Sequence, residues 1–506
     1  MNIEELLTRV PLLEPEAPAV ESGAEWWSWA QMAEVTNAVR LGMDEAATSP
    51  GTRIGLLLRN RAPHLAALIA CVLSERCAVA FNPVLPPVKL AEDVRAQAPA
   101  LLIGAREDVV GRNTGVVASS LGIPVLLLPD LAGDVVEWSE DRRRIPEQPS
   151  DSLRPETMIE MLSSGTTGPP KRIPLLRSSF NQSFRSAQAY EKDRGSAGPV
   201  LRSGVRLQTA PLTHISGLFT GLMTFAEGRK LVLLEKFSVD SWVAAVERTR
   251  PRIGNLPPAA LRMILDANIP KERLASLIAL RSGTAPLDPA VIDAFQQRYG
   301  LPVLVQYGAT EFSGSVAGWE IKAFKELYAA KRGSVGRIQA NLDARIVDAD
   351  SGDPLPFGEQ GILELKGQQL GDKDRWVRTT DRASLDADSY LWIHGRADNA
   401  INRGGFKIHP DDVAGVLEQH PAIREAVVVG VPDRRLGETP AAAIILAADQ
   451  SPPTIADLRS FLGEKLLPYQ IPTTFLFVDE LPRTPALKPN LPEVRRLFIS
   501  TMEAPT

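Results

Sequence analysis

Short apolar runs alternate with helix-like segments through the N-terminal part of the chain, and this alternation restricts the fold more than any other feature. Residues 25–40 carry apolar side chains at helical spacing, residues 53–58 form a strand-like run, and residues 63–74 predict a second helix. Another apolar strand follows at 77–81, before a proline-rich turn. Strands separated by helices favour a parallel sheet covered by helices.

The same alternation continues with a helix-like segment at 93–100 and apolar strands at 101–104 and 125–128. The last part of the chain has a different pattern. There, an amphipathic segment at 411–421 precedes two strand-like runs, and a second amphipathic segment, IADLRSFLGEKLL, follows them. We therefore expect a separate small α+β unit at the C-terminal end.

Length and composition limit the class of protein. At 506 residues the chain exceeds what one hydrophobic core usually supports, so we expect at least two domains. Its 44% hydrophobic and 23% charged residues are ordinary for a soluble globular protein, and its net charge of −5 offers no basic surface to nucleic acid. No apolar run approaches about 18 residues, and the acidic N-terminus lacks a long apolar segment. We predict a cytoplasmic protein without a transmembrane segment or nucleic-acid partner, and an oligomer is compatible with these features.

The chain has two cysteines, Cys71 and Cys77, in an apolar stretch. Two thiols without a neighbouring pair of histidines cannot complete a zinc site. We predict that both are buried structural thiols.

A loop rich in hydroxyl groups and glycine, SSGTTGPPKR at 163–172, lies between apolar runs at 158–162 and 173–176. The two runs predict strands, so the segment between them is a hairpin loop. Its glycines let backbone N–H groups turn inward, its hydroxyls add donors, and its lysine adds a mobile cation, a combination that suits a polyphosphate. The expected phosphate-binding residues are Ser163, Ser164, Gly165, Thr166, Thr167, Gly168 and Lys171.

This loop is not a Walker A motif, because the spacing G-x-x-x-x-G-K-[ST] is absent. On composition alone, a solvated Ser/Thr/Gly linker explains the segment equally well. The loop therefore needs support from the rest of the chain.

A second candidate site follows the strand-like run at 303–306, which leads directly into Tyr307, Thr310 and Glu311. Ligands bind at the carboxyl ends of parallel strands, and Mg²⁺ prefers carboxylate and phosphate oxygens. Considered alone, the Thr-Glu pair also suits the start of a helix. By the same reasoning, a lone histidine such as His214 is more often a packing residue, and a lysine in a proline-rich loop, such as Lys488, is more often solvated.

Taken in order, SSGTTGPPK, QYGATE, VRTTD, GRADNAINRGGFKIHP and LPRTPALK resemble the motifs of the adenylate-forming superfamily. This superfamily includes acyl-CoA synthetases, the adenylation domains of peptide synthetases and firefly-type luciferases. The resemblance covers essentially the whole chain. It implies an α/β fold with a large N-terminal domain of helix-covered sheets, over 1–395, and a small mobile C-terminal α+β domain, over 396–506.

The resemblance also implies roles for single residues. The 163–171 loop would hold the phosphates of ATP, Tyr307 would stack on adenine, and Thr310 would donate to the α-phosphate. Glu311 would hold Mg²⁺, and Asp381 would accept hydrogen bonds from the ribose hydroxyls. The remaining nucleotide contacts that it implies are Gly283, Thr284, Ala285 and Arg396.

Further implied roles concern the second substrate and the moving domain. Asp398 would be the hinge, and Gly405 and Lys407 would lie beside the pantetheine tunnel of CoA. Lys488 would be the catalytic lysine. His214 would border the acyl pocket, where it contacts the substrate carboxylate or gates the tunnel.

Three positions depart from the superfamily pattern: Thr380 and Leu487 each replace a usual glycine, and Ile362 replaces a usual acidic residue. Thr380 puts the backbone conformation beside Asp381 in question, and Leu487 puts the conformation of the Lys488 loop in question. The third is expected to be a detail of a strand.

The resemblance implies an ATP- and Mg²⁺-dependent ligase that joins a carboxylic acid to CoA through an acyl-adenylate. The alternatives are a stand-alone adenylation enzyme that loads a carrier protein, a non-catalytic nucleotide-binding protein, and a luciferase-type oxygenase. Near the expected acyl pocket the side chains are small or apolar, which favours a neutral aromatic, alicyclic or fatty monocarboxylic acid. These side chains are Ala309, Ser313, Gly314, Val316, Ala317 and Gly318.

Overall fold

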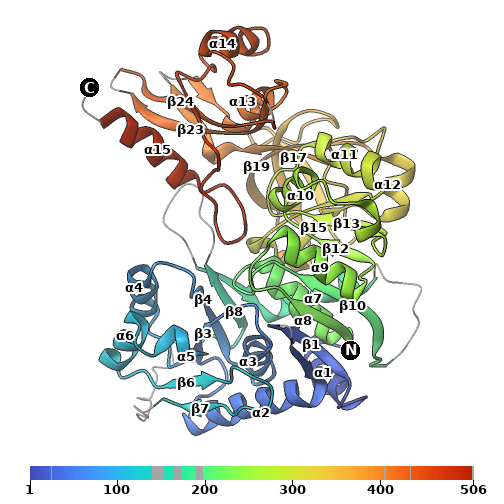
Figure 1. The fold of residues 1–506 in the computed structure, drawn as a ribbon, viewed down its shortest axis with the longest axis vertical. Coiled ribbons are helices and arrows are strands. Elements are labelled where there is room, and N and C mark those ends of the chain that lie inside the picture. Colours follow the sequence, from blue (N-terminus) through green and yellow to red (C-terminus); the bar gives the residue numbers. More distant parts are fainter. Residues whose placement is uncertain are drawn as a thin grey trace.

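The computed structural model describes residues 1–23, 25–139, 153–162, 172–189, 198–403, 406–433, 435–448 and 450–503. Figure 1 shows a large part built from several sheets, with the last part of the chain forming a smaller body at one end. No helix in the described ranges is long and apolar enough to cross a membrane.

The first sheet has the strand order β7-β6-β5-β3-β4-β8-β9. Its central strands run parallel, as the alternating sequence predicts, and the edge strands β7 and β9 are antiparallel to their neighbours. The strands are β3 (Arg53–Leu57), β4 (Cys77–Phe81), β5 (Leu101–Ala105), β6 (Val125–Leu128), β7 (Glu137–Trp138), β8 (Thr157–Leu162) and β9 (Arg172–Leu176).

Helices bury both faces of this sheet. Alternate strand residues such as Ile54 and Leu56 join the core beside α2 (Trp29–Glu45) and α3 (Ala62–Leu73). Their neighbours Leu57 and Val79 join a second core beside α4 (Pro87–Gln97) and α6 (Asn113–Leu121). A short helix, α5 (Arg106–Val109), follows β5. Burial on both faces explains why these strands are nearly continuous apolar runs.

One expected element is wrong in part, because residues 25–40 do not form one helix. Glu25–Ser28 is a strand, β2, that pairs antiparallel with β1 (Pro18–Ser22). The helix begins at Trp29, where the Ser28 hydroxyl accepts a hydrogen bond from the Gln31 backbone and the Gln31 side chain caps Ser28 in return. The capping box fixes this start, and pairing with β1 sets the conformation before it.

A second sheet, β10-β11-β1-β2, joins the N-terminal strands to later ones. Helix α8 (Ile215–Ala226) packs into the same core as α3, together with the N-terminal helix α1 (Ile3–Arg9). The other elements here are η1 (Val10–Leu12), α7 (Arg177–Ala189), β10 (Arg202–Gln208) and β11 (Arg229–Leu233).

The third sheet has the order β12-β13-β14-β15-β16, and β12, β13 and β14 run parallel. Helices around it bury a core that includes Trp242 and Phe295. Its elements are α9 (Val239–Thr249), β12 (Ile253–Asn255), α10 (Pro258–Asp266), η3 (Lys271–Leu274), β13 (Ala279–Ser282), α11 (Pro289–Tyr299), β14 (Val303–Ala309), η4 (Thr310–Phe312), β15 (Gly314–Gly318), α12 (Ile321–Leu327) and β16 (Arg337–Ile338).

An antiparallel sheet, β17-β18-β19-β20, completes the large domain. This sheet contains two of the three residues that differ from the superfamily motifs. Ile362 is a buried residue of β18. Thr380 lies in the extended strand β19, where the backbone is not left-handed and does not require glycine. Its elements are β17 (Asp343–Val347), β18 (Gly361–Lys366), η5 (Gln368–Leu370), β19 (Val377–Leu385) and β20 (Leu391–Arg396).

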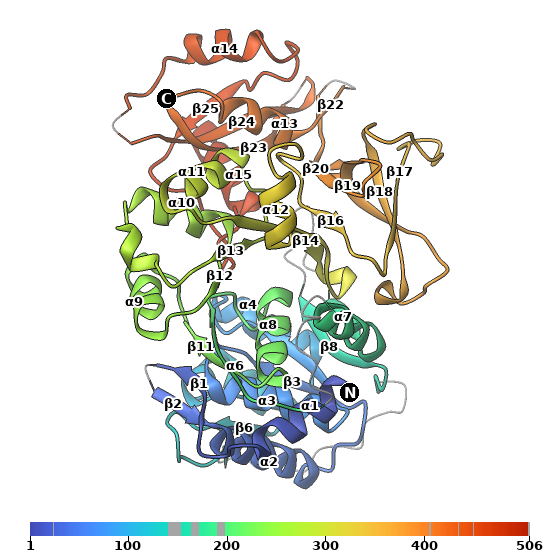
Figure 2. The same ribbon diagram turned by 90° about the vertical axis from the view of Figure 1, so that its right-hand side faces the viewer.

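The small domain is the expected α+β unit, a sheet β22-β21-β24-β23 to which β25 adds in parallel beside β24. One face buries α13 and α14, and the other buries α15. Figure 2 shows it stacked on the end of the large domain. Its elements are η6 (Ala397–Asn399), β21 (Ile401–Arg403), β22 (Phe406–Ile408), α13 (Pro410–Leu417), β23 (Ile423–Asp433), β24 (Gly437–Leu446), α14 (Ile455–Gly463), β25 (Thr474–Phe477) and α15 (Leu491–Glu503).

Both cysteines are free and buried, as predicted. Burial raises the pKa of the Cys71 and Cys77 thiols to about 12, so neither carries thiolate at neutral pH.

Candidate active site

The turn after β13 has an unusual backbone. A Cβ at Gly283 would lie 2.8 Å from the carbonyl oxygen of Gln306, so glycine lets the end of β13 approach β14. Thr284 has a φ of +73°, which is rare for a β-branched residue, and its buried hydroxyl has no partner among the described residues. The Ser282 hydroxyl is also buried and unpartnered there. Backbone strain beside hydroxyls that have no partner in the described part of the chain is typical of a ligand-binding turn.

Strand β14 runs three residues longer than the sequence indicates, through Tyr307 to Ala309. A Cβ at Gly308 would lie 2.3 Å from the carbonyl oxygen of Gly314, so only glycine allows β14 to pair this closely with β15. Thr310 then opens η4, and Glu311 projects as an exposed carboxylate. No hydrogen bond or ion pair engages Glu311 within the described ranges.

The ends of β14 and β19 are joined by a hydrogen bond from the Tyr307 hydroxyl to the Asp381 carboxylate. Burial and the neighbouring Asp381 charge raise the pKa of Tyr307 well above its usual value, so the phenol stays protonated and donates. Burial also raises the pKa of Asp381, and the Tyr307 hydrogen bond and the charge of Arg396 oppose that rise. The aromatic ring and the carboxylate are therefore held as one unit.

At the end of β20, Arg396 forms a two-point ion pair with Asp398, at 2.8 Å from Nε to Oδ1 and 2.5 Å from Nη2 to Oδ2. Hydrogen bonding to Asp398 raises the pKa of Arg396, and Asp381 and Glu311 add to this effect. The predicted hinge residue thus has a side-chain partner in this arrangement.

The small domain contributes Lys488 from the loop that precedes α15. Figure 1 shows this loop reaching from the small domain toward the large one. Burial and the charge of Arg396 lower the pKa of Lys488, and the charge of Glu311 opposes this effect. The side chain is half-buried, and no protein group in the described part of the chain hydrogen-bonds its ammonium.

His214 is the N-cap residue of α8, and its Nδ1 lies 3.4 Å from the Ser216 hydroxyl. A Cβ at Gly217 would come 2.2 Å from the carbonyl oxygen of Pro211, so glycine permits this tight turn. Burial lowers the pKa of His214 to about 4, with a further contribution from Lys488. The imidazole is therefore neutral at pH 7 and lies near Lys488.

Glu311 is better suited to bind a magnesium ion than to form part of a structural metal site. Among the described residues, no group of three or more His, Cys, Asp and Glu side chains could hold a metal ion. A single protein carboxylate, completed by the phosphates of a substrate, is the donor set with which Mg²⁺ is usually bound.

A hydrogen bond joins Tyr307 to Asp381. Electrostatic interactions connect Arg396 with Asp381 and Glu311, and Lys488 of the small domain with Arg396, Glu311 and His214. Lys407 is apart from this group, exposed on the edge strand β22. The predictions for Ser163–Gly168, Lys171 and Gly405 fall outside the described residues, although the strands that flank the loop pair antiparallel as predicted.

Sequence reasoning missed the groups that hold Lys488 in place. Arg483 donates from Nη1 to the carbonyl oxygen of Leu487 at 3.2 Å, and its Nη2 contacts both carboxylate oxygens of Glu425, at 2.9 and 2.7 Å. The available signal was the position of Arg483 within the same short motif as the lysine.

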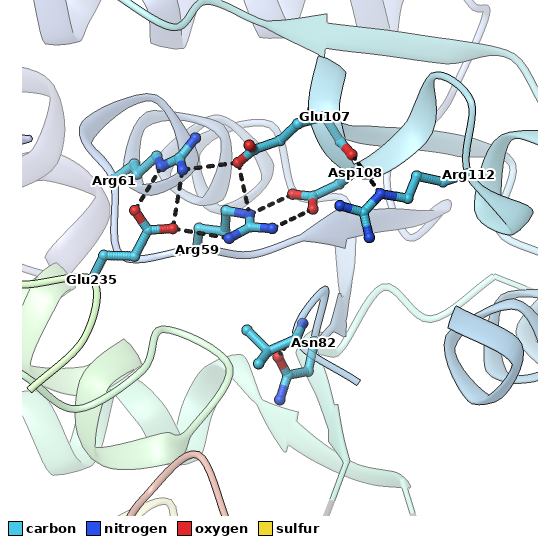
Figure 3. A network of polar contacts seen from close by, with 8 residues as sticks. Arg59, Arg61, Asn82, Glu107, Asp108, Arg112 and Glu235 are labelled. Atoms are coloured by element: carbon cyan, nitrogen blue, oxygen red, sulfur yellow. Dashed lines mark hydrogen bonds and ion pairs between the residues drawn. The ribbon is translucent and has the colours of Figure 1, made fainter. Parts of the chain in front are cut away.

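A second polar network lies where the first and second sheets meet (Figure 3). Arg59 contacts Asp108 at 2.6 Å and Glu235 at 2.9 Å, and Arg61 contacts Glu107 at 2.8 Å and Glu235 at 3.1 Å. Each cation thus meets at least two carboxylates. The network ties the sheets together and satisfies Arg59 and Arg61 with carboxylate partners.

Comparisons with known proteins cover both domains. Residues 8–372 match the AMP-binding enzyme family, and residues 412–488 match the AMP-binding enzyme C-terminal domain. A protein named 4-coumarate–CoA ligase-like 3, from Oryza sativa subsp. japonica, is 27% identical over 525 aligned residues, which cover 96% of this chain and 87% of that protein.

Two solved structures have the same fold. The o-succinylbenzoate CoA synthetase of Bacillus subtilis, in complex with its acyl-adenylate intermediate, superposes with a TM-score of 0.77 at 23% identity, covering 97% of each chain. ATP-bound MatB from Rhodopseudomonas palustris superposes with a TM-score of 0.81 at 20% identity, covering 99% of this chain and 100% of that one. The predicted fold class, a large N-terminal and a small C-terminal α/β domain, is confirmed.

Proposed function

Because the chain belongs to the AMP-binding enzyme family, we propose that it is an AMP-forming acid–CoA ligase. The observation that carries this proposal is the position of Lys488. A half-buried ammonium from one domain interacts electrostatically with Glu311 and Arg396 of the other, and the described residues supply it no hydrogen-bond partner. Partial burial of a cation is costly, and the phosphates of a nucleotide would offset that cost.

In the first half-reaction, an oxygen of the substrate carboxylate attacks the α-phosphorus of ATP in line. The new C–O–P bond forms as the bond to the β-phosphate breaks, which gives acyl-AMP and pyrophosphate. Lys488 stabilises the negative charge on the phosphate oxygens, and Thr310 donates to the same group. Mg²⁺ held by Glu311 would neutralise further phosphate charge.

The nucleoside would be held by the paired groups. Tyr307 presents its ring to the adenine, and Asp381, steadied by the Tyr307 hydroxyl, accepts from the ribose. The free hydroxyl of Thr284 offers one more donor to the base.

In the second half-reaction, the small domain rotates about Asp398 and withdraws Lys488. The CoA sulfur then attacks the acyl carbonyl, AMP leaves, and the thiol proton needs an acceptor. We assign that role to His214, because the withdrawal of Lys488 removes one of the two influences that lower its pKa.

For the substrate, we propose a neutral aromatic, alicyclic or fatty monocarboxylic acid. The first two turns of α8, which begin at Ile215, carry no charged side chain that could pair with a second carboxylate. The name of the rice relative supports including 4-coumarate and similar aryl acids among the candidates.

A pyrophosphate-release screen over a panel of acids tests this proposal. We expect release with ATP, Mg²⁺ and an aryl or medium- to long-chain acid, and thioester formation when CoA is added. Faster turnover of malonate than of every such acid would contradict the substrate class. Comparing free CoA with a phosphopantetheinylated carrier protein separates a CoA ligase from an enzyme that loads a carrier. Nucleotide binding without pyrophosphate release would overturn the enzymatic function.

A further inference from the structure

The turn that carries Lys488 is a closed hairpin. Arg483 and Pro489 form a β-bridge across its base. The Thr484 N–H donates to the Lys488 carbonyl oxygen at 2.8 Å, and the Lys488 N–H donates to the Thr484 hydroxyl at 3.2 Å. The Leu487 N–H donates to the Thr484 carbonyl oxygen at 2.8 Å. The backbone of Leu487 is thus fixed from within the turn.

This fixed backbone is left-handed at Leu487, with a φ of +59°. An L-residue with a branched, bulky side chain rarely adopts this conformation, whereas glycine adopts it freely. Glycine is also the residue that the superfamily pattern has at this position. The left-handed conformation costs free energy for leucine, so we look for a contact of its side chain that offsets this cost.

The side chain of Leu487 supplies such a contact across the domain boundary. It is half-buried and packs against the core beneath the third sheet, whose members all lie between Leu207 and Tyr390. Within the described ranges, Leu487 is the one side chain from the small domain that joins this core.

Polar contacts also join the two domains, among them the ion pair between Arg382 of β19 and Asp412 of α13 at 3.1 Å. Arg262 of α10 donates to the Arg424 carbonyl oxygen at 2.7 Å and contacts Glu418 at 3.3 Å, and Arg424 contacts Asp266 at 2.9 Å. Water can replace the exposed Arg424–Asp266 pair at little cost, whereas the Arg262–Glu418 pair is largely buried. Exposing an apolar side chain such as that of Leu487 is unfavourable for a different reason, the loss of hydrophobic burial. Leu487 therefore provides a different kind of attachment, directly beside the catalytic lysine.

We propose that Leu487 is a positioning residue that anchors the Lys488 loop to the large domain. The anchor holds the ammonium where acyl-AMP forms, and it must leave the large-domain core before the small domain can rotate for thioester formation. The inference rests on the proposed function, because that function assigns Lys488 to the first half-reaction. Beyond that function, the inference identifies Leu487 as a residue that stabilises the domain arrangement in which acyl-AMP forms.

Single-turnover kinetics of Leu487→Gly, Leu487→Ala and Leu487→Met test the anchor. Leu487→Gly relaxes the backbone and removes the anchor, Leu487→Ala removes the anchor but keeps the unfavourable conformation, and Leu487→Met keeps an apolar side chain. We expect acyl-AMP formation to slow by about five- to tenfold in the first two variants and to stay near wild type in the third. Thioester formation from supplied acyl-AMP and CoA should not slow in Leu487→Gly. Wild-type adenylation by Leu487→Gly, or equal losses in both half-reactions, would overturn the proposal.

A second readout does not depend on activity. Fluorescent dyes on cysteines introduced at Leu327 and Ile455, which are exposed on the large and small domains, report the distance between the domains in the full-length, ligand-free protein. Cys71 and Cys77 are buried and should not compete for the dyes. We expect a broader distance distribution in Leu487→Gly than in wild type, and an unchanged distribution would overturn the anchor. If the distribution broadens although wild type releases no pyrophosphate with any acid, the proposed function is wrong and the anchor stands.

Discussion

The small domain has two surfaces that meet the rest of the molecule differently. The loop of Lys488 is docked on the large domain, where Leu487 packs against the core beneath the third sheet and Lys488 is half-buried. The edge strand β22 faces outward, with Lys407 exposed and Phe406 56% exposed. Phe406 stacks on Tyr469, with ring centroids 4.6 Å apart and an interplanar angle of 19°.

This difference suggests that the structure represents one of two working arrangements. The docked surface carries Lys488, which we assign to acyl-AMP formation, and the exposed surface carries Lys407, which the resemblance assigns to the CoA tunnel. An exposed aromatic ring such as Phe406, held by stacking on the half-buried Tyr469, is a ready contact for another surface. Rotation about the hinge would exchange the two surfaces, so changes on each should affect different half-reactions.

The largest effect is expected from Lys488→Ala. Removing one preorganised charge from a site where negative charge develops typically costs about 10²–10³-fold in rate. Acyl-AMP formation should fall by that amount, as measured by single-turnover pyrophosphate release. Circular dichroism would show that the variant is folded, and a folded variant with a wild-type rate would mean that Lys488 is only a surface lysine.

The next largest effect is expected from Asp398→Pro, on the other half-reaction. Asp398 lies in η6, where a 3₁₀ conformation has a φ close to that of proline, so proline should fix the present arrangement. Acyl-AMP formation should survive, and thioester formation should fall by about a hundredfold because the second surface no longer reaches its position.

Asp398→Ala is the matched control for this variant, because it also loses the ion pair with Arg396 but leaves the backbone free. If the alanine variant behaves like the proline variant, the loss of the Arg396–Asp398 ion pair, and not the blocked rotation, would explain the slower thioester formation. Equal loss of both half-reactions would indicate misfolding or a direct binding role.

A smaller effect is expected from Glu311→Gln, which keeps the size of the side chain and removes its charge. The Mg²⁺ concentration for half-maximal acyl-AMP formation should rise by about tenfold or more. Thioester formation from supplied acyl-AMP should be unaffected by Mg²⁺ in both proteins. An unchanged Mg²⁺ requirement would exclude Glu311 as the ligand.

The smallest effect is a shift in pH dependence for Tyr307→Phe. The Tyr307 hydroxyl lowers the pKa of Asp381 against the effect of burial, so removing the hydroxyl should raise that pKa. The carboxylate would then be protonated at a higher pH, and ATP affinity should be lost at a higher pH on the acid side than in wild type. Isothermal titration calorimetry from pH 5 to 8 would measure this, and identical profiles would show that Asp381 does not bind the ribose as a carboxylate.

Much of the fold could be predicted because burial on both faces makes strands such as β3 and β4 continuous apolar runs. The prediction failed at residues 25–28, where pairing with β1 overrides the helical spacing of the apolar side chains. That pairing depends on a neighbouring strand, which a local periodicity does not detect.

The candidate site shows a similar limit. Motifs identified Tyr307, Asp381 and Lys488 singly, but the hydrogen bond between Tyr307 and Asp381 joins residues 74 positions apart. At Leu487 the local rule favours glycine, and the contact with the large-domain core that accompanies leucine appears only in the folded structure.

The most direct test of the two-surface account measures both half-reactions in Lys488→Ala and Lys407→Ala. One assay follows acyl-AMP formation from acid and ATP, and the other follows thioester formation from supplied acyl-AMP and CoA. We predict a crossed result, in which Lys488→Ala loses the first reaction and keeps the second, while Lys407→Ala keeps the first and slows the second. If both variants lost the same half-reaction, or if each slowed both equally, the assignment of the two surfaces to separate steps would be wrong.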